Sequence, residues 1–98
     1  MKKWGDKMNR EERRRQLQAL KAYARERDRV FTDFVRSGDI EPVRAFCTMY
    51  RMPFPDDDRA FRGAIYKAVQ YCTDIPAAVK QLAAEKCREL GMDPHPWG

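Results

Sequence analysis

The stretch that decides the fold runs from residue 50 to residue 61 and reads Tyr50-Arg51-Met52-Pro53-Phe54-Pro55-Asp56-Asp57-Asp58-Arg59-Ala60-Phe61. Proline cannot occupy a helix interior and disfavours helical geometry in the residue before it, so Pro53 closes the segment that precedes it. The three acids predict an N-cap and an acidic first turn for a new helix, because the helix dipole favours negative charge there. Phe54, held between two prolines, is expected to insert into the core that the flanking helices form.

Upstream of this stretch, residues 10–36 contain neither proline nor glycine. Asn9 followed by Glu12 is a capping-box pattern, and Ser37-Gly38 is a stop signal, so the sequence predicts one long helix after a basic leader at residues 1–8 that contains Trp4. At about 100° per residue, its apolar face holds Leu17, Leu20, Ala24, Phe31, Phe34 and Val35. The opposite face gathers Arg14, Gln18, Lys21, Arg25, Arg29 and Arg36.

A second helix is predicted from Asp39 as N-cap, with Pro42 tolerated in its first turn. Apolar residues occupy most of its circumference, at Val43, Ala45, Phe46, Cys47, Met49, Tyr50 and Met52. A helix that is apolar on most sides usually lies at the centre of a domain. We therefore expect this helix to be the most buried of the set.

Two more helices follow the decisive stretch, the third at about residues 57–72 and the fourth at about residues 76–90. Asp74 before Pro76 is a start signal for the fourth, and Gly91 is its stop signal. Residues 92–98, which include Trp97, are expected to be irregular. The sequence predicts an all-α fold, a compact four-helix domain with a long basic first helix.

Length and composition fit a single domain over residues 1–98, because 43% of the residues are hydrophobic and 36% are charged. No apolar run approaches the roughly 20 residues that a membrane-spanning helix needs. The start of the chain also lacks the apolar stretch of a signal peptide. We therefore expect a cytoplasmic protein with no membrane partner.

The three cysteines, Cys47, Cys72 and Cys87, are widely spaced and form no Cys-x-x-Cys pair. This usage indicates a reducing compartment and buried free thiols. Together with His95 they could complete a tetrahedral zinc site. Because the ligands are unpaired in sequence and Cys47 and Cys72 fall on apolar helix faces, we expect thiols that pack as small hydrophobes, with no metal and no other cofactor.

The run Tyr50 to Pro55, the acids, Phe61 and Lys67-Ala68, followed by a helix that starts with proline, resembles small uncharacterised bacteriophage and prophage proteins over about residues 45–90. In that pattern a Trp follows the Phe and a His precedes the Lys-Ala, whereas this chain has Arg62 and Tyr66. The resemblance implies a mobile-element origin, and hence the cytoplasm of a bacterial host cell. It favours a regulator or an inhibitor of host machinery without identifying a target.

Positive charge is concentrated in the first third of the chain. Residues 1–36 carry twelve Lys and Arg against six Asp and Glu, and residues 37–98 carry eight against nine. Such asymmetry points to a polyanionic partner, and arginines one helical turn apart can contact successive phosphates. The simpler interpretation is a solvated face that keeps the protein soluble.

The third helix offers a second candidate surface on its expected outer face, formed by Arg59, Arg62, Tyr66 and Gln70. Such side chains can read base edges or anchor a protein interface. Helices two and three could also be arranged as a helix-turn-helix. Three consecutive acids would then sit at the end that usually faces DNA and repel phosphate, which disfavours a sequence-specific DNA reader.

These patterns predict a small, basic, non-enzymatic protein of phage or mobile-element type that binds a nucleic acid or a nucleoprotein, as a regulator or as a host-defence inhibitor of the anti-CRISPR kind. The alternative is a helical protein–protein interaction module that forms a homodimer through its long first helix and has no nucleic-acid role. An enzyme is the least favoured class, because His95 lies between two prolines with no recognisable nucleophile nearby.

Overall fold

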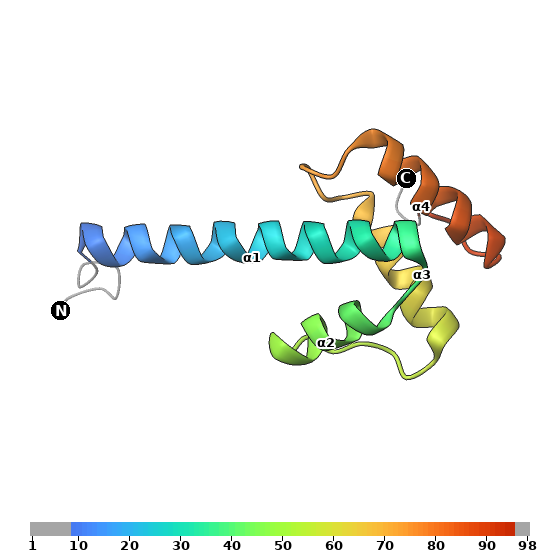
Figure 1. Cartoon of the computed structure of the whole chain (residues 1–98), viewed down its shortest axis with the longest axis horizontal. Coiled ribbons are helices and arrows are strands. Elements are labelled where there is room, and N and C mark those ends of the chain that lie inside the picture. Colours follow the sequence, from blue (N-terminus) through green and yellow to red (C-terminus); the bar gives the residue numbers. More distant parts are fainter. Residues whose placement is uncertain (1–8, 96–98) are drawn as a thin grey trace.

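The computed structural model describes residues 9–95, and over these residues it contains helices and no strand. The helices are α1 (Arg10–Ser37), α2 (Glu41–Met49), α3 (Asp58–Val69) and α4 (Ala77–Glu89) (Figure 1). The predicted all-α fold of four helices with a long first helix is therefore confirmed. Residues 92–95 are irregular, as expected. The leader at residues 1–8 with Trp4, and Trp97 in the tail, lie outside the described residues.

The ends of α1 follow the local sequence signals. The side chain of Asn9 accepts a hydrogen bond from the Glu12 backbone N–H at 2.8 Å, which satisfies one of the free donors at the start of the helix. At the other end Gly38 adopts a left-handed conformation with φ of 78° and donates its N–H to the Phe34 carbonyl. Glycine adopts this conformation without the steric cost of a Cβ atom, so the helix stops where the sequence predicts.

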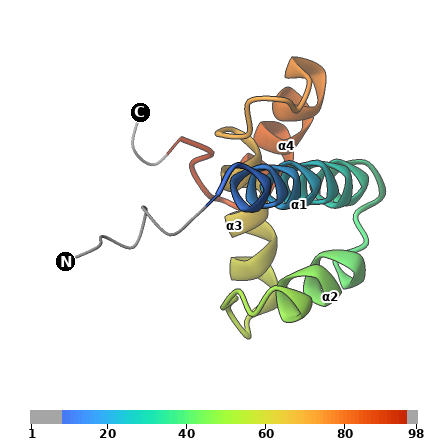
Figure 2. The ribbon, with the colours of Figure 1, turned by 90° about the vertical axis from the view of Figure 1, so that its left-hand side faces the viewer.

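The two halves of α1 have different surroundings. Every residue from 10 to 22 is exposed, and we call this segment the arm. Residues 23–37, the packed half, lie against the other helices (Figures 1 and 2). The arm projects beyond the other helices and makes the molecule elongated, with principal extents of 54 × 28 × 25 Å for the whole structure (Figure 1). It consists only of Arg, Glu, Gln, Leu, Ala and Lys, all strong helix formers, so it extends a helix that packing has already nucleated.

The apolar face predicted for α1 is exposed along the arm and buried in the packed half. Leu17 is 58% exposed and Leu20 is 64% exposed, whereas Phe34 and Val35 in the packed half are almost completely buried. Ala24, at the boundary, is half-buried. Periodicity identified the apolar face, but the helices that would cover it end short of the arm.

The core forms where the packed half of α1 meets α3 and α4. Phe34 of α1 stacks on Tyr66 of α3 with ring centroids 5.0 Å apart. Other members from the three helices include Val30, Phe31, Val35, Phe61, Ile65, Val69, Val79, Ala83 and Cys87. In Figure 2, where α1 is seen nearly end-on, α2 and α4 lie on opposite sides of it. Burial of these side chains supplies most of the free energy that holds the helices together.

The expectation that α2 is the most buried helix is wrong. It is short and packs chiefly against α1, and it buries Val43, Phe46 and Cys47. Met49 at its end is 75% exposed and Tyr50 just beyond it is 42% exposed. The helix with the larger share of buried residues is α3, which contacts both α1 and α4. Some of the apolar residues in and next to α2, such as Met49 and Tyr50, therefore lie on the protein surface.

The Pro53-Phe54-Pro55 segment behaves as predicted. Phe54 is half-buried and stacks on Phe61 with ring centroids 4.7 Å apart. The guanidinium of Arg44 lies over both rings, 5.7 Å from the Phe54 centroid and 5.4 Å from that of Phe61. This aromatic pair pins the connection between α2 and α3 to the start of α3.

One of the three predicted caps after α1 is confirmed. The Asp57 carboxylate accepts a hydrogen bond from the Ala60 backbone N–H at 2.8 Å and caps α3. Asp39 is not the N-cap of α2, because Ile40 takes that position. The Asp39 carboxylate nevertheless accepts a hydrogen bond from the Glu41 backbone N–H at 3.1 Å. Asp74 does not cap α4 either, since an extra turn at residues 73–75 places Pro76 at the N-cap.

Candidate functional site

The predicted cationic stripe lies along the solvent side of α1, and most of it is on the arm or next to it. Arg14, Lys21, Arg25 and Arg36 are exposed. None of these four side chains forms an ion pair with another residue of the described part, 9–95. Gln18, between Arg14 and Lys21, is also exposed. Their positive charge is therefore available to a partner in solution.

Arg29 differs from the other members of the stripe. Its guanidinium lies 2.6 Å from a Glu26 carboxylate oxygen and 3.5 Å from an Asp33 oxygen. The hydrogen bond to Glu26 is the main reason that the pKa of Arg29 is raised above its ordinary value. Its charge is locally compensated, so the stripe is interrupted at this turn. Glu26 and Asp33 lie three residues before and four residues after Arg29, so the sequence alone could have indicated both contacts.

Arg14 and Lys21 on the arm share one face of α1 with Arg25, which lies about one turn beyond the arm. With a rise of about 1.5 Å per residue, Lys21 and Arg25 are separated by about 6 Å along the axis, and Arg14 and Lys21 by about 10 Å. Residues 10–22 carry five basic side chains against two acidic ones. A linear polyanion lying along this face could contact all three of these cations at once, because no other helix of residues 9–95 lies beside the arm (Figure 1).

Three members of the second candidate surface on α3 are partly or fully buried, whereas Arg59 is exposed. Tyr66 is only 5% exposed, and burial raises the pKa of its hydroxyl. Arg62 donates hydrogen bonds to Asp58 and to the Gly38 carbonyl, both at 2.7 Å, and lies over the Phe34 ring. These contacts fasten the start of α3 to the end of α1.

Gln70 and Arg59 also make structural contacts. The Gln70 side-chain amide donates to the Lys80 carbonyl at 2.8 Å, which connects the end of α3 to α4. The Arg59 guanidinium donates to the Leu90 carbonyl at the end of α4. Of the four predicted residues Tyr66 is buried, and Arg59, Arg62 and Gln70 each donate a hydrogen bond to another segment of the protein. Sequence periodicity placed them on one side of α3 but did not show that α1 and α4 occupy that side.

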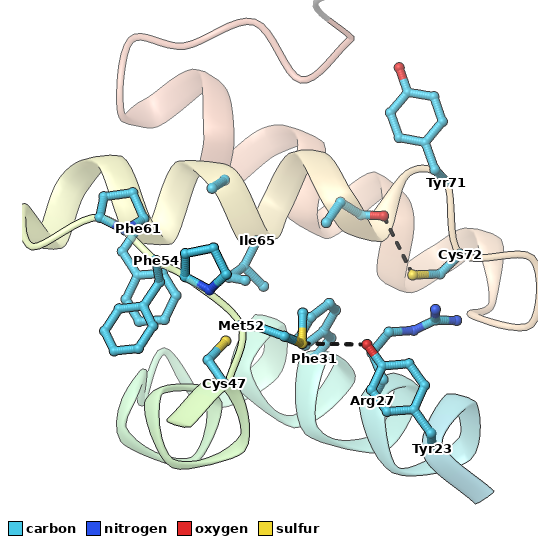
Figure 3. A pocket seen from close by; sticks show the side chains of 14 residues that line it. Tyr23, Arg27, Phe31, Cys47, Met52, Phe54, Phe61, Ile65, Tyr71 and Cys72 are labelled. Atoms are coloured by element: carbon cyan, nitrogen blue, oxygen red, sulfur yellow. Dashed lines mark hydrogen bonds between the residues drawn. The ribbon is translucent and has the colours of Figure 1, made fainter. Parts of the chain in front are cut away.

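An apolar groove, which the sequence did not predict, opens between α1, α3 and the Pro53-Phe54-Pro55 segment (Figure 3). Its volume is about 440 Å³. The Tyr23 hydroxyl donates a hydrogen bond to the Met52 sulfur at 3.4 Å across one wall, and Arg27 at the edge pairs with Asp28 at 3.0 Å. The Pro-Phe-Pro run forms one wall of the groove, but nothing in its sequence indicated that a groove lies beside it.

The three thiols are buried, as the sequence predicts. Burial raises the pKa of Cys47, Cys72 and Cys87 above the ordinary thiol value. Such thiols remain neutral and are poor nucleophiles at physiological pH. Within residues 9–95 no group of three or more His, Cys, Asp and Glu side chains lies close enough together to hold a metal ion. Among the helices of the described part, none is both long and apolar enough to cross a membrane.

The comparison with known proteins found no relative of this chain. No protein-family model matches the chain, and neither a curated protein nor a solved structure matches it.

Proposed function

We propose that this chain is a small, non-enzymatic binding protein whose arm engages a nucleic acid or a nucleoprotein. The observation that carries the proposal is the exposure of Arg14 and Lys21 on the projecting arm and of Arg25 just beyond it, without a compensating ion pair in the described residues. Exposed cations that a protein leaves uncompensated attract polyanions, and they release counterions from a phosphate backbone on binding.

The proposal places the protein in the cytoplasm of a bacterial host, as a regulator or an anti-CRISPR-type inhibitor encoded by a phage or mobile element. This part rests on the resemblance of residues 45–90 to small phage proteins. A non-enzymatic role is favoured because the three thiols are buried and neutral. The partner is recognised through phosphate charge, not through base edges, since the Arg and Gln side chains of α3 are engaged within the protein.

The test is a titration of fluorescent duplex DNA and of fluorescent RNA, each of random sequence, with the full chain over a series of salt concentrations. We expect binding at low salt that weakens as salt rises. Each phosphate contact contributes roughly 0.9 to the slope of log affinity against log salt for duplex DNA. The triple variant Arg14→Gln, Lys21→Gln, Arg25→Gln is expected to lose most of the affinity and of the slope.

A matched control removes the same charge elsewhere. The triple variant Arg51→Gln, Lys86→Gln, Arg88→Gln changes net charge equally but leaves the arm intact, so it should bind nearly as well as the unchanged protein. A sharper pair is Arg25→Gln against Arg29→Gln, because these residues are about one helical turn apart and only Arg29 is compensated by carboxylates. Equal losses from both triple variants, or no binding to either nucleic acid at low salt, would contradict the proposal.

A further inference from the structure

The groove between α1, α3 and the Pro53-Phe54-Pro55 segment plays no part in the proposed function. Its volume of about 440 Å³ lies within the range of small-molecule sites, roughly 300–1,000 Å³. Cys47 of α2 and Met52 beyond it complete the lining. On α1 the groove residue Arg27 follows Arg25 of the cationic stripe by two residues, which turns it about 200° around the helix. The groove and the stripe therefore lie on opposite sides of α1.

The two ends of the groove differ in chemistry (Figure 3). Phe54 and Phe61 form one end with their stacked rings, and Ile65 lines the middle. The other end holds the Tyr23 hydroxyl and the Arg27 guanidinium, whose central carbon lies 5.9 Å from the centroid of the Tyr23 ring. Arg27 is also the one lining residue that is charged at neutral pH. The groove thus has an aromatic end and a polar, cationic end.

The hydrogen-bond donors at the polar end are incompletely used. The Tyr23 hydroxyl donates to the Met52 sulfur at 3.4 Å, and a thioether is a weak acceptor. Arg27 donates from Nε and Nη2 to a single Asp28 oxygen, at 3.1 and 3.0 Å. Its other amino group, Nη1, donates to no acceptor within residues 9–95. A carboxylate at this end would accept from both side chains through charge-assisted hydrogen bonds, which are stronger than a bond to sulfur.

We propose that the groove binds a small aromatic carboxylic acid, with its rings toward Phe54 and Phe61 and its carboxylate at Tyr23 and Arg27. Aromatic walls favour a flat aromatic body, because rings gain from offset stacking and edge-to-face contact beyond the area that they bury. Asp28 offsets part of the charge of Arg27 but leaves the Nη1 donors to the ligand. An ammonium group has donors and no acceptor, so a basic aromatic ligand does not match this end.

Naphthalene-2-carboxylate is the probe that tests the inference, and its neutral isostere naphthalene-2-carboxamide is the control ligand. Isothermal titration calorimetry with the full chain should show a single site for the acid and weaker binding of the amide. The melting temperature should rise with the concentration of the acid, because the ligand binds the folded chain alone.

A pair of arginine variants tests the role of the polar end. Arg27→Gln should weaken binding of the acid roughly tenfold or more, because a hydrogen bond to a charged group contributes on that order. It should leave binding of the amide nearly unchanged. Arg29→Gln is the matched control, because it removes the same charge from another ion-paired arginine, on the side of α1 away from the groove. Both ligands should bind this variant as they bind the unchanged chain.

Two further readouts locate the site. Ala64→Leu fills the groove from α3 and should abolish binding, whereas Ala22→Leu makes the same change in the arm and should not. Circular dichroism checks that both variants keep their helical content. In nuclear magnetic resonance spectra of the unchanged chain, the naphthalene protons should show Overhauser contacts to the methyl groups of Met52 and Ile65. The methyl groups of Val79, a core residue outside the groove lining, should show none.

The inference is overturned if the acid does not bind at millimolar concentration, or if it binds a folded Ala64→Leu variant as well as the unchanged chain. Contacts of the naphthalene protons to residues outside the groove would also overturn it. Equal binding of acid and amide, with no effect of Arg27→Gln, would overturn the assignment of a carboxylate. None of these outcomes bears on the proposed function, because the variants keep Arg14, Lys21 and Arg25.

Discussion

The arm and the packed half of α1 belong to one unbroken helix, yet different forces hold them. The packed half is fixed by burial, with Phe34 stacked on Tyr66 and Val35 completely enclosed. The arm has only its local propensity, its Asn9 cap and its continuity with the packed half. Tertiary packing normally supplies most of the stability of a helix in a protein. The arm can therefore change chemically with little effect on the fold, which suits a segment that binds.

The largest difference between the two halves should appear when a large apolar side chain is removed from each. Phe34→Ala empties a fully buried site next to Tyr66 and should cost about 3–5 kcal/mol of unfolding free energy. Leu20→Ala removes an exposed side chain in the arm and should stay within about 0.5 kcal/mol. Urea denaturation followed by circular dichroism, at a concentration where the chain is monomeric, measures both. Similar costs for the two variants would mean that the arm is packed in solution.

A smaller difference is expected from the two N-caps. Asp57 caps α3, whose residues belong to the core, so Asp57→Ala should lower the unfolding free energy by about 1 kcal/mol. Asn9 caps the tip of the arm, and Asn9→Ala should leave global stability unchanged while fraying the first turns of α1. Hydrogen exchange distinguishes the two outcomes, because fraying accelerates exchange of arm amides alone. Faster exchange throughout the core of the Asn9 variant would contradict the separation of the two halves.

The sequence predicted features that are determined locally. The start of α1 at Asn9, its stop at Gly38 and the cap at Asp57 depend on side chains within a few residues, and all three are as expected. Asp39 and Asp74 carry similar signals but do not take the N-cap position. A residue that could cap a helix can instead be drawn into a turn next to it. The extra turn before Pro76 includes Asp74 and so keeps it from the N-cap position of α4.

The candidate site was less predictable because it depends on what covers each face. Periodicity gave Leu17 and Phe34 the same orientation, although only Phe34 has a neighbour. It also gave Tyr66 and Gln70 a common side of α3, without showing that α1 and α4 lie there. The ion pairs of Arg29 could have been predicted from the sequence, because Glu26 and Asp33 lie about one helical turn from it. Contacts between distant segments, including the groove, had no such local signal.

The smallest effect should come from ionisation of the buried thiols, and only in alkaline solution. Burial raises the pKa of Cys47, Cys72 and Cys87 in the folded protein. Their contribution to stability is fully present below the unfolded thiol pKa of about 8.5. As pH rises above that value the unfolded chain releases its thiol protons first, so the unfolding free energy falls, and the contribution is lost as the pH rises through the folded values.

Urea denaturation at several mildly alkaline pH values, below the range where tyrosines ionise, measures this decline. The Cys87→Ala variant removes one fully buried thiol and should show a shallower decline with pH, whatever its stability at neutral pH. A cysteine introduced in the arm by Ala19→Cys provides the comparison, because an exposed thiol has nearly the same pKa in both states and should leave the slope unchanged. An equally steep decline in the Cys87→Ala variant would mean that burial in the core does not shift the ionisation of that thiol.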